Sequence, residues 1–289
     1  MSVLAQQLVL GLMIGGLYGL AAVGLSLVFG VLKVLNVAHG ELIMLGGYGA
    51  FWLFSLLGLD PFASLLVVVP LSLLLGLGLY WALFTFVVRA DEETRVKNSL
   101  LIGFGLALAL DALALRLWTA DERSIDIAYG GAALSVGDLS FPVVRLASLV
   151  LAFALIGTLH LLLTRWRWGQ AIRATAEDWQ AALLTGIDVR RAYLLAFAIG
   201  TGLAGAAGTL VSIGYSINPS IGLEWTLKSL IVVVLAGLGS VFGTFVGGLF
   251  LGVAEAVSAA AFGGPYREVV GLVIFVVVLV IRPHGLFGR

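Results

Sequence analysis

Three polar side chains crowd into the turn Lys33–Glu41, which separates the first two long apolar runs of the chain. Asn36, His39 and Glu41 fall close together in this turn. An imidazole beside a carboxylate could pass a proton, because ionisable groups inside a bilayer often mark such a relay. We expect both groups to reach water, which disfavours a relay. Two interpretations stay open. Asn36 and Glu41 cap the positive end of the following helix, or the turn shapes the inner mouth of a pathway or contacts a partner.

Few other charged residues interrupt the apolar runs. Asp111 and Arg116 lie in one run at a spacing that does not share a helix face, so we expect each to pair elsewhere or Arg116 to extend outward. Glu255 is more isolated, and we interpret it as a bonded structural carboxylate near the outer mouth, with a pathway role as the alternative. Glu224 and Lys228 predict a local surface pair worth about 0.2–0.5 kcal/mol. No pair of nucleophile and base stands out, which leaves catalysis with the least support.

The longest polar stretch is 165–191, with the sequence RWRWGQAIRATAEDWQAALLTGIDVRR. Its interleaved apolar and charged residues predict a short surface helix that ends at Gly186. The segment could lie on the membrane interface with its tryptophans as anchors. Its mixed charges favour instead a helix that docks into a groove on another protein. The candidate docking residues are Arg173, Glu177, Asp178, Gln180, Ala181, Ala182 and Gly186.

The composition places the chain in a membrane. Of 289 residues, 61% are hydrophobic and 11% charged, and the mean hydropathy is +1.12, whereas charged residues make up about 25% of soluble domains. The absence of cysteine excludes disulfide scaffolds and thiolate metal sites, and three histidines make no convincing zinc site. A net charge of zero removes the electrostatic case for nucleic acid as a partner. We therefore expect no metal and no cofactor.

The apolar runs predict an all-α polytopic membrane protein with eight or nine transmembrane helices, forming a single transmembrane domain over 1–289. The runs are continuous and lack the alternation of an outer-membrane barrel, and only helices or closed barrels satisfy the backbone in lipid. The first run has no basic region before it and no cleavage site, so it predicts a permanent helix. The predicted blocks are 8–32, 40–58, 62–88, 98–118, 143–164, 191–213, 226–239, 241–261 and 266–282.

The basic residues predict the orientation of these helices. Eleven of the sixteen, from Lys33 to Arg289, fall on one side of the alternating blocks, which marks that side as cytoplasmic. The loop between Thr119 and Pro142, which includes Asp138, is acidic and is expected outside. Nine crossings would place the N-terminus outside and the C-terminus in the cytoplasm. Eight helices with one re-entrant or broken segment remain an alternative.

Glycine is abundant, with 38 residues, which indicates close helix packing. The densest stretch, 235–248, favours a broken helix beside a cavity, because irregular backbone is tolerated where it lines one. This stretch therefore contains three pathway or gate candidates, Gly237, Gly239 and Ser240. The other candidates are Asn36, His39, Glu41 and Glu255.

Several stretches resemble the permease subunits of ABC importers, specifically the LivH-type branched-chain amino acid permeases and their urea and amide relatives. The resemblance covers nearly the whole chain. It is carried by 18–30, 36–41, 44–48, 169–187, 237–240 and 282–286, the last of which includes Pro283.

The segment from Gln180 to Gly186 resembles the start of the EAA-x-x-x-G coupling pattern of importer permeases, with Gln in place of Glu. The later part of that pattern is absent, so contacts known for other importers transfer only as a location. The resemblance implies that this segment is a coupling helix resting in a cleft of a cytoplasmic ATPase. The chain contains no G-x-x-x-x-G-K-[ST] phosphate loop, so ATP would be bound by the partner ATPase subunits.

The resemblance further implies an importer of branched-chain or other small neutral amino acids in a bacterial-type inner membrane. Its partners would be ABC ATPase subunits, a second related permease and a soluble extracytoplasmic binding protein, with the acidic outer loop as a candidate rim. Three alternatives stay open. One is a permease for urea or short amides. A second is an ion-coupled transporter using Asp111 or Glu255, and the third is a channel with opposed half-helices at Asn36 and Asn218.

Overall fold

Each predicted apolar block forms a helix, because in lipid only the chain itself can satisfy the backbone N–H and C=O groups. The computed structural model describes residues 2–137, 139–282 and 285–287. Asp138 of the acidic loop, Pro283 of the last resembling stretch and Arg289 of the basic set lie outside the described residues.

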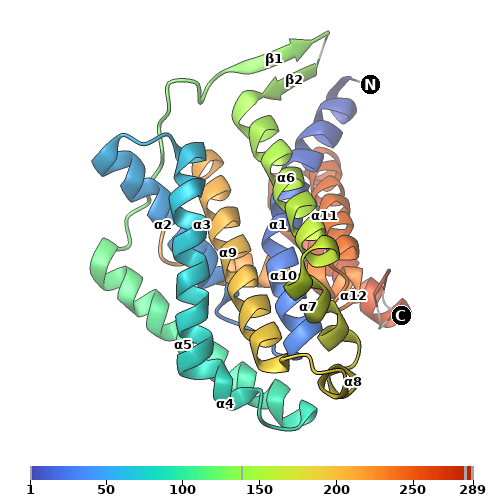
Figure 1. The fold of residues 1–289 in the computed structure, drawn as a ribbon. Coiled ribbons are helices and arrows are strands. Elements are labelled where there is room, and N and C mark those ends of the chain that lie inside the picture. The colour runs from blue at the N-terminus through green and yellow to red at the C-terminus, as the bar shows by residue number, and fades with distance from the viewer. Residues whose placement is uncertain (1, 138, 283–284, 288–289) are drawn as a thin grey trace.

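The helices form a bundle with a small hairpin at one end (Figure 1). Strands β1 (Ala133–Val136) and β2 (Leu139–Pro142) are antiparallel and were not predicted from the sequence. The helical elements are α1 (Ser2–Leu32), α2 (His39–Leu57), α3 (Pro61–Leu79), the π-helical turn η1 (Tyr80–Phe84), α4 (Thr85–Val87), α5 (Glu92–Trp118), α6 (Val143–Arg165), α7 (Arg167–Glu177), α8 (Trp179–Leu184), α9 (Val189–Gly214), α10 (Ile221–Ala236), α11 (Val241–Phe262), the 3-10 turn η2 (Gly264–Tyr266) and α12 (Arg267–Ile281).

Seven helical stretches among the described residues are long and apolar enough to cross a membrane. They are α1, α2, the continuous α3–η1–α4 helix, α5, α6, α9 and α11. The two remaining predicted blocks became α10, with 16 residues, and α12, with 15. Both are shorter than the about 20 residues that a full crossing needs. The prediction of a helical polytopic membrane protein is confirmed.

Two helix triplets repeat the same arrangement in opposite directions. α1 packs along α11, and α9 packs along α3, while α1 and α9 cross each other at the centre of the bundle. At this crossing Gly24 and Gly200 lie so close that a Cβ on Gly200 would come within 2.8 Å of the Gly24 carbonyl oxygen. The triplet α1–α2–α3 therefore mirrors the triplet α9–α10–α11 in an inverted sense.

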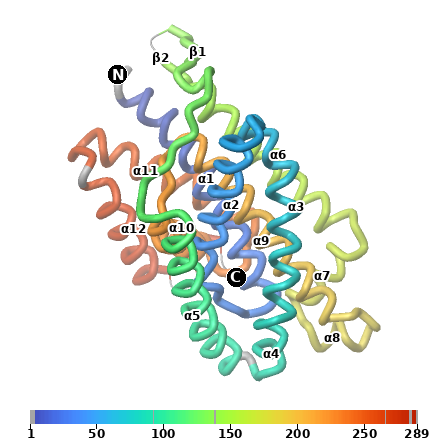
Figure 2. Tube along the Cα trace, turned by 90° about the vertical axis from the view of Figure 1, so that its left-hand side faces the viewer, coloured from blue at the N-terminus to red at the C-terminus, as the bar shows by residue number. Residues whose placement is uncertain are grey.

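The bundle has two distinct ends, which we name for the elements they carry. The hairpin end carries β1 and β2, and the α8 end carries α4 and α8 (Figure 1). Figure 2 shows the long connection after α5 climbing the side of the bundle to the hairpin. Arg123 in this connection exchanges two backbone hydrogen bonds of 2.8 Å with Ile217, which ties it to the chain between α9 and α10.

Glycines on α1 allow α11 to pack closely against it. A Cβ on Gly15 would lie 2.8 Å from the carbonyl oxygen of Gly248, and one on Gly11 would lie 2.9 Å from the carbonyl oxygen of Gly252. The glycine spacing of the first block therefore serves helix packing, as expected. By contrast, α3 and α5 are mostly exposed apolar helices, with Leu66 81% exposed, as a lipid-facing surface requires.

Candidate functional site

α2 begins deep inside the bundle. Lys33 ends α1 in the left-handed region, with φ of 54°, and reverses the chain. Residues 34–38 then run back along α1 without helical structure. The Nε2 atom of His39 lies 2.8 Å from the carbonyl oxygen of Ala21, so α2 starts about 15 Å from the end of α1.

α10 begins in the same way, after a matching turn. In the turn before α2, the N–H of His39 donates to the Asn36 carbonyl at 3.2 Å. In the turn before α10, the N–H of Ile221 donates to the Asn218 carbonyl at 3.3 Å. The pattern N-x-x-x-G therefore occurs twice, ending at Gly40 and at Gly222. This repeat is the sequence signal that would have revealed the inverted triplets.

The first turns of α2 and α10 meet at the α2–α10 crossing, formed by Gly40, Gly222 and Thr226. The N–H of Gly40 donates to Thr226 Oγ1 at 2.9 Å, and that hydroxyl donates to the Val37 carbonyl at 3.1 Å. Gly40 faces the carbonyl of Gly222 with no room for a side chain between them. The two helices can start here only because both positions are glycine.

The turn residues are buried, contrary to expectation. Asn36, His39 and Glu41 are 2%, 1% and 5% exposed, so the prediction that His39 and Glu41 reach water is wrong. The predicted capping by Asn36 is also wrong, because its Oδ1 accepts from Ala38 N at 3.2 Å and supports the turn instead. The cause is the chain reversal at Lys33, which folds an apparently interfacial stretch into the bundle.

Glu41 is the least satisfied group at the crossing. Its carboxylate lies against Gly222. Its Oε2 atom is buried without a hydrogen-bond partner among the described residues. A buried carboxylate in this position is costly unless it is protonated or meets a cation.

Glu255 is fully buried and bonded on both oxygens. Tyr18 donates to Oε2 at 2.9 Å, Lys228 donates to Oε1 at 2.5 Å, and Arg267 donates to Oε2 at 3.1 Å. This Glu255 cluster joins α1, α10, α11 and α12. The interpretation of Glu255 as a bonded carboxylate is confirmed.

The predicted surface pair of Lys228 with Glu224 is wrong. Lys228 has a side chain that is only 16% exposed and bonds to Glu255, while Glu224 is exposed to solvent. A cation stabilises the buried carboxylate of Glu255 far more than it stabilises the solvated carboxylate of Glu224. Lys228 therefore pairs with Glu255. The role of Arg267 could not be predicted from the sequence, because only the turn after α11 brings this residue back to Glu255.

Gly237, Gly239 and Ser240 form the tight turn between α10 and α11. The glycines have φ of 103° and 89°, which only glycine adopts readily. Gly239 lies against Gly30 near the end of α1, and Ser240 caps α11 by accepting from Gly243 N at 3.2 Å. The predicted break between two helices is confirmed, and turn geometry accounts for these residues. Their role in a pathway stays a prediction.

The predicted surface helix is two helices with a kink. Asp178 has an extended backbone that ends α7, and its side chain caps α8 by accepting from Gln180 N at 2.9 Å and Ala181 N at 3.0 Å. Gly186, with φ of 81°, ends α8, and the N–H of Ile187 then donates to the Ala182 carbonyl at 3.1 Å.

α7 anchors this segment and α8 projects from it. Gly169, Ile172 and Thr175 of α7 are buried, whereas Leu184 at the end of α8 is 90% exposed. The remaining candidates divide in the same way: Ala182 is buried, and Arg173, Glu177, Gln180 and Ala181 are exposed. An exposed apolar tip on a short, well-capped helix is typical of a protein-docking element.

Nine of the eleven basic residues expected on one side belong to elements at the α8 end. They lie at the end of α1, between α4 and the first turns of α5, at the joint of α6 and α7, and at the start of α9. They are Lys33, Arg89, Arg95, Lys97, Arg165, Arg167, Arg173, Arg190 and Arg191.

The sequence that folds into this bundle is similar to known proteins. Residues 7–281 fit the family model described as "Branched-chain amino acid transport system / permease component". The chain belongs to this family. The permease is accordingly a multi-pass membrane protein and a transport subunit.

Curated relatives extend over nearly the whole permease. It is 32% identical to the high-affinity branched-chain amino acid transport system permease protein BraD of Pseudomonas aeruginosa, over 98% of this chain and 95% of the relative. It is 30% identical to LivH of Escherichia coli over the same shares. It is 29% identical to a probable LivH of Methanocaldococcus jannaschii, over 93% of this chain and 88% of the relative. No solved structure matches the permease.

Proposed function

We propose that the permease is the membrane-spanning subunit of an ATP-driven importer, with α8 as the helix that docks on a cytoplasmic ATPase. The observation that carries this proposal is the exposed tip of α8, at Leu184, held on the anchored helix α7. The gathering of basic residues at the α8 end favours a cytoplasmic α8 end, with the N-terminus outside. The C-terminus would then lie in the cytoplasm.

A path from α8 to the membrane interior runs through α9. α7 packs on α6 and α9, and α9 packs on α2 and α3. Movement of α8 by an ATPase would therefore reach the α2–α10 crossing through two packed interfaces. Because Gly40 and Gly222 are in direct contact there, a small shift of α9 would change how the two helix starts fit together.

The substrate follows from the names of the relatives and from the chemistry of the interior. Relatives over almost the full chain are named as branched-chain amino acid permeases. A branched-chain or other small neutral amino acid, delivered by a soluble binding protein, would suit an apolar bundle with few fixed charges. Urea and short amides are the alternative within the family. A second related permease would complete the membrane part, and ATP would be bound by the ATPase subunits, leaving this chain without a cofactor.

One observation favours a second function, an ion-coupled transporter. The carboxylate of Glu41 is buried and lacks a hydrogen-bond partner among the described residues, as a proton-carrying group would. Glu255 fits this function less well, because two cations and a hydroxyl already satisfy it.

The test is recovery of partner subunits with a matched pair of variants. The tagged permease is extracted gently from its native membrane and analysed by mass spectrometry after mild cross-linking. Wild-type protein should carry ATPase subunits, and Leu184→Glu on α8 should lose them. Leu134→Glu, at an exposed position on β1, should keep them. Isolation of the wild-type permease without any ATPase would overturn the proposal.

A further inference from the structure

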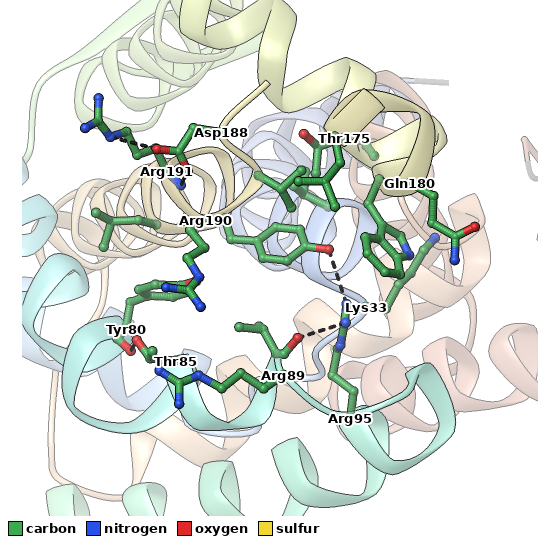
Figure 3. A pocket seen from close by; sticks show the side chains of 18 of the residues that line it. Lys33, Tyr80, Thr85, Arg89, Arg95, Thr175, Gln180, Asp188, Arg190 and Arg191 are labelled. Atoms are coloured by element: carbon green, nitrogen blue, oxygen red, sulfur yellow. Dashed lines mark hydrogen bonds and ion pairs between the residues drawn. The ribbon is translucent and has the colours of Figure 1, made fainter. Parts of the chain in front are cut away.

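A cavity of about 1250 Å³ opens at the α8 end, between α4, the start of α5, the α7–α8 segment and the start of α9. Figure 3 shows Arg89 and Arg190 extending into one side of it, next to Tyr80, with Thr175 and Gln180 on the opposite wall. We call the side formed by Tyr80, Arg89 and Arg190 the basic wall. Neither arginine of the basic wall has an ion-pair partner among the described residues.

Arginines line the cavity together with Tyr80. They include Arg89, Arg95 and Arg190, and Figure 3 shows Arg190 beside the ring of Tyr80. Arg95 is buried and already donates to the carbonyls of Leu32, Val88 and Ala90, so it holds this corner together. Arg89 and Arg190 are exposed and remain available to a ligand.

Three of the four carboxylates that line the cavity cap the starts of helices. Asp91 accepts from Thr94 N at 3.0 Å and caps α5. Asp188 accepts from Arg191 N at 3.1 Å, caps α9 and pairs with the Arg191 side chain at 2.9 Å. Asp178 caps α8, as described above, and Glu177 belongs to the same α7–α8 wall. The start of α9, with its partial positive charge, adds to the field of the basic wall.

The cavity also borders the lipid-facing surface of the bundle. Trp81 lines it and is 78% exposed, and Phe86 on the same continuous helix is 65% exposed. The surface continues along α3 through Leu74, which is 62% exposed. Aromatic side chains gather at the headgroup level of a bilayer, so a ligand at the basic wall would have its apolar part beside these residues. A soluble acidic protein segment does not require an exposed apolar surface beside the basic wall.

We propose that the cavity binds the phosphate of an anionic phospholipid between Arg89 and Arg190, with its acyl chains along Trp81 and the exposed face of α3. Arginine pairs suit phosphate because each guanidinium presents parallel donors to its oxygens. Basic pockets between helices at the cytoplasmic face of a membrane are where such headgroups bind. The bound lipid bridges α4 to α9 beside the docking helix α8.

The test measures lipid binding to the full-length permease in detergent by native mass spectrometry. Dioleoylphosphatidylglycerol is titrated against dioleoylphosphatidylcholine. The double variant Arg89→Gln with Arg190→Gln should bind the anionic lipid about thirtyfold more weakly. The matched control, Arg165→Gln with Arg167→Gln, removes two exposed charges at the same end that do not line the cavity, and should bind like wild type.

Further variants and ligands distinguish binding of a lipid headgroup from binding of free inorganic phosphate. Trp81→Ala should weaken binding of the lipid and leave binding of inorganic phosphate unchanged, and this variant serves if the double variant does not fold. Equal binding of both lipids, or equal effects of both double variants, would overturn the proposal. Complete displacement of the lipid by millimolar inorganic phosphate would show a soluble-anion site instead. Loss of ATPase subunits from the Arg89/Arg190 variant, with lipid binding unchanged, would show a protein contact.

Discussion

Lys228 Nζ lies 2.5 Å from Glu255 Oε1, which ties the short helix α10 to α11 in the interior of the bundle. Arg267 completes the arrangement from α12 at 3.1 Å, so one carboxylate is held by two cations. The cluster therefore links the two short helices to the long helices α1 and α11.

Glu255→Gln should destabilise the permease strongly. The change leaves the charges of Lys228 and Arg267 without their carboxylate, and breaking a buried ion pair costs about 3–5 kcal/mol. Because Arg267 is partly exposed, we expect a loss of about 2–4 kcal/mol in the free energy of unfolding. Denaturant unfolding in mixed micelles measures it. The control is Glu93→Gln, which breaks the exposed pair with Lys97 and should cost less than about 0.5 kcal/mol. Similar losses for both variants would contradict the structural role of the cluster.

Gly40→Ala should disrupt the α2–α10 crossing. A methyl group at this position meets the Gly222 carbonyl and Thr226, and overpacking of this kind costs about 1–3 kcal/mol. The matched control is Gly157→Ala in α6, where nothing lies within 4 Å of the added Cβ. The control should gain about 0.5–1 kcal/mol from lower chain entropy in the unfolded state. The thermal unfolding midpoint should therefore fall in Gly40→Ala and rise in Gly157→Ala. A higher midpoint in Gly40→Ala would show that the starts of α2 and α10 do not touch.

The helices could be predicted from the sequence because a continuous apolar run in lipid has few structural choices. Block 40–58 became α2 at His39–Leu57, and the break near Gly239 was placed correctly. The depth of a helix start could not be predicted, since it depends on the single left-handed residue Lys33. A polar turn at a membrane boundary and a polar turn folded into the bundle have the same composition.

The candidate sites could also be predicted only in part from the sequence. The α7–α8 segment was predicted because its pattern is local, although the kink at Asp178 was not. The partners of Glu255 depend on contacts among four helices, which a single sequence does not encode in its spacing. The preference of Lys228 for Glu255 over Glu224 follows only once the burial of each carboxylate is known.

Tyr129 should hold its proton to unusually high pH. Burial, together with the hydrogen bond to Asp60 and the negative charge of that carboxylate, raises the pKa of Tyr129 to about 12. A tyrosine pKa raised in the folded state adds stability that is complete below the unfolded value of about 10 and is lost as pH rises toward 12. Spectrophotometric titration of wild type and Tyr129→Phe should therefore differ by one phenol that ionises near pH 12. Asp60→Asn is the control, because it removes the charge and should let Tyr129 ionise earlier. A difference spectrum that titrates near 10 would contradict the contact.

Glu41→Gln should separate an ATP-driven importer from an ion-coupled transporter. The amide removes a buried charge that lacks a hydrogen-bond partner among the described residues, so stability should stay equal or rise. In the importer, leucine uptake into vesicles carrying the whole complex should persist in Glu41→Gln and Asp111→Asn, provided that ATP is present. Leu184→Glu should abolish that uptake, because it removes the contact with the ATPase. An ion-coupled transporter gives the reverse pattern, with uptake driven by a proton gradient, lost in Glu41→Gln and retained in Leu184→Glu. Exposed Glu224→Gln is the matched control and should behave as wild type in both assays.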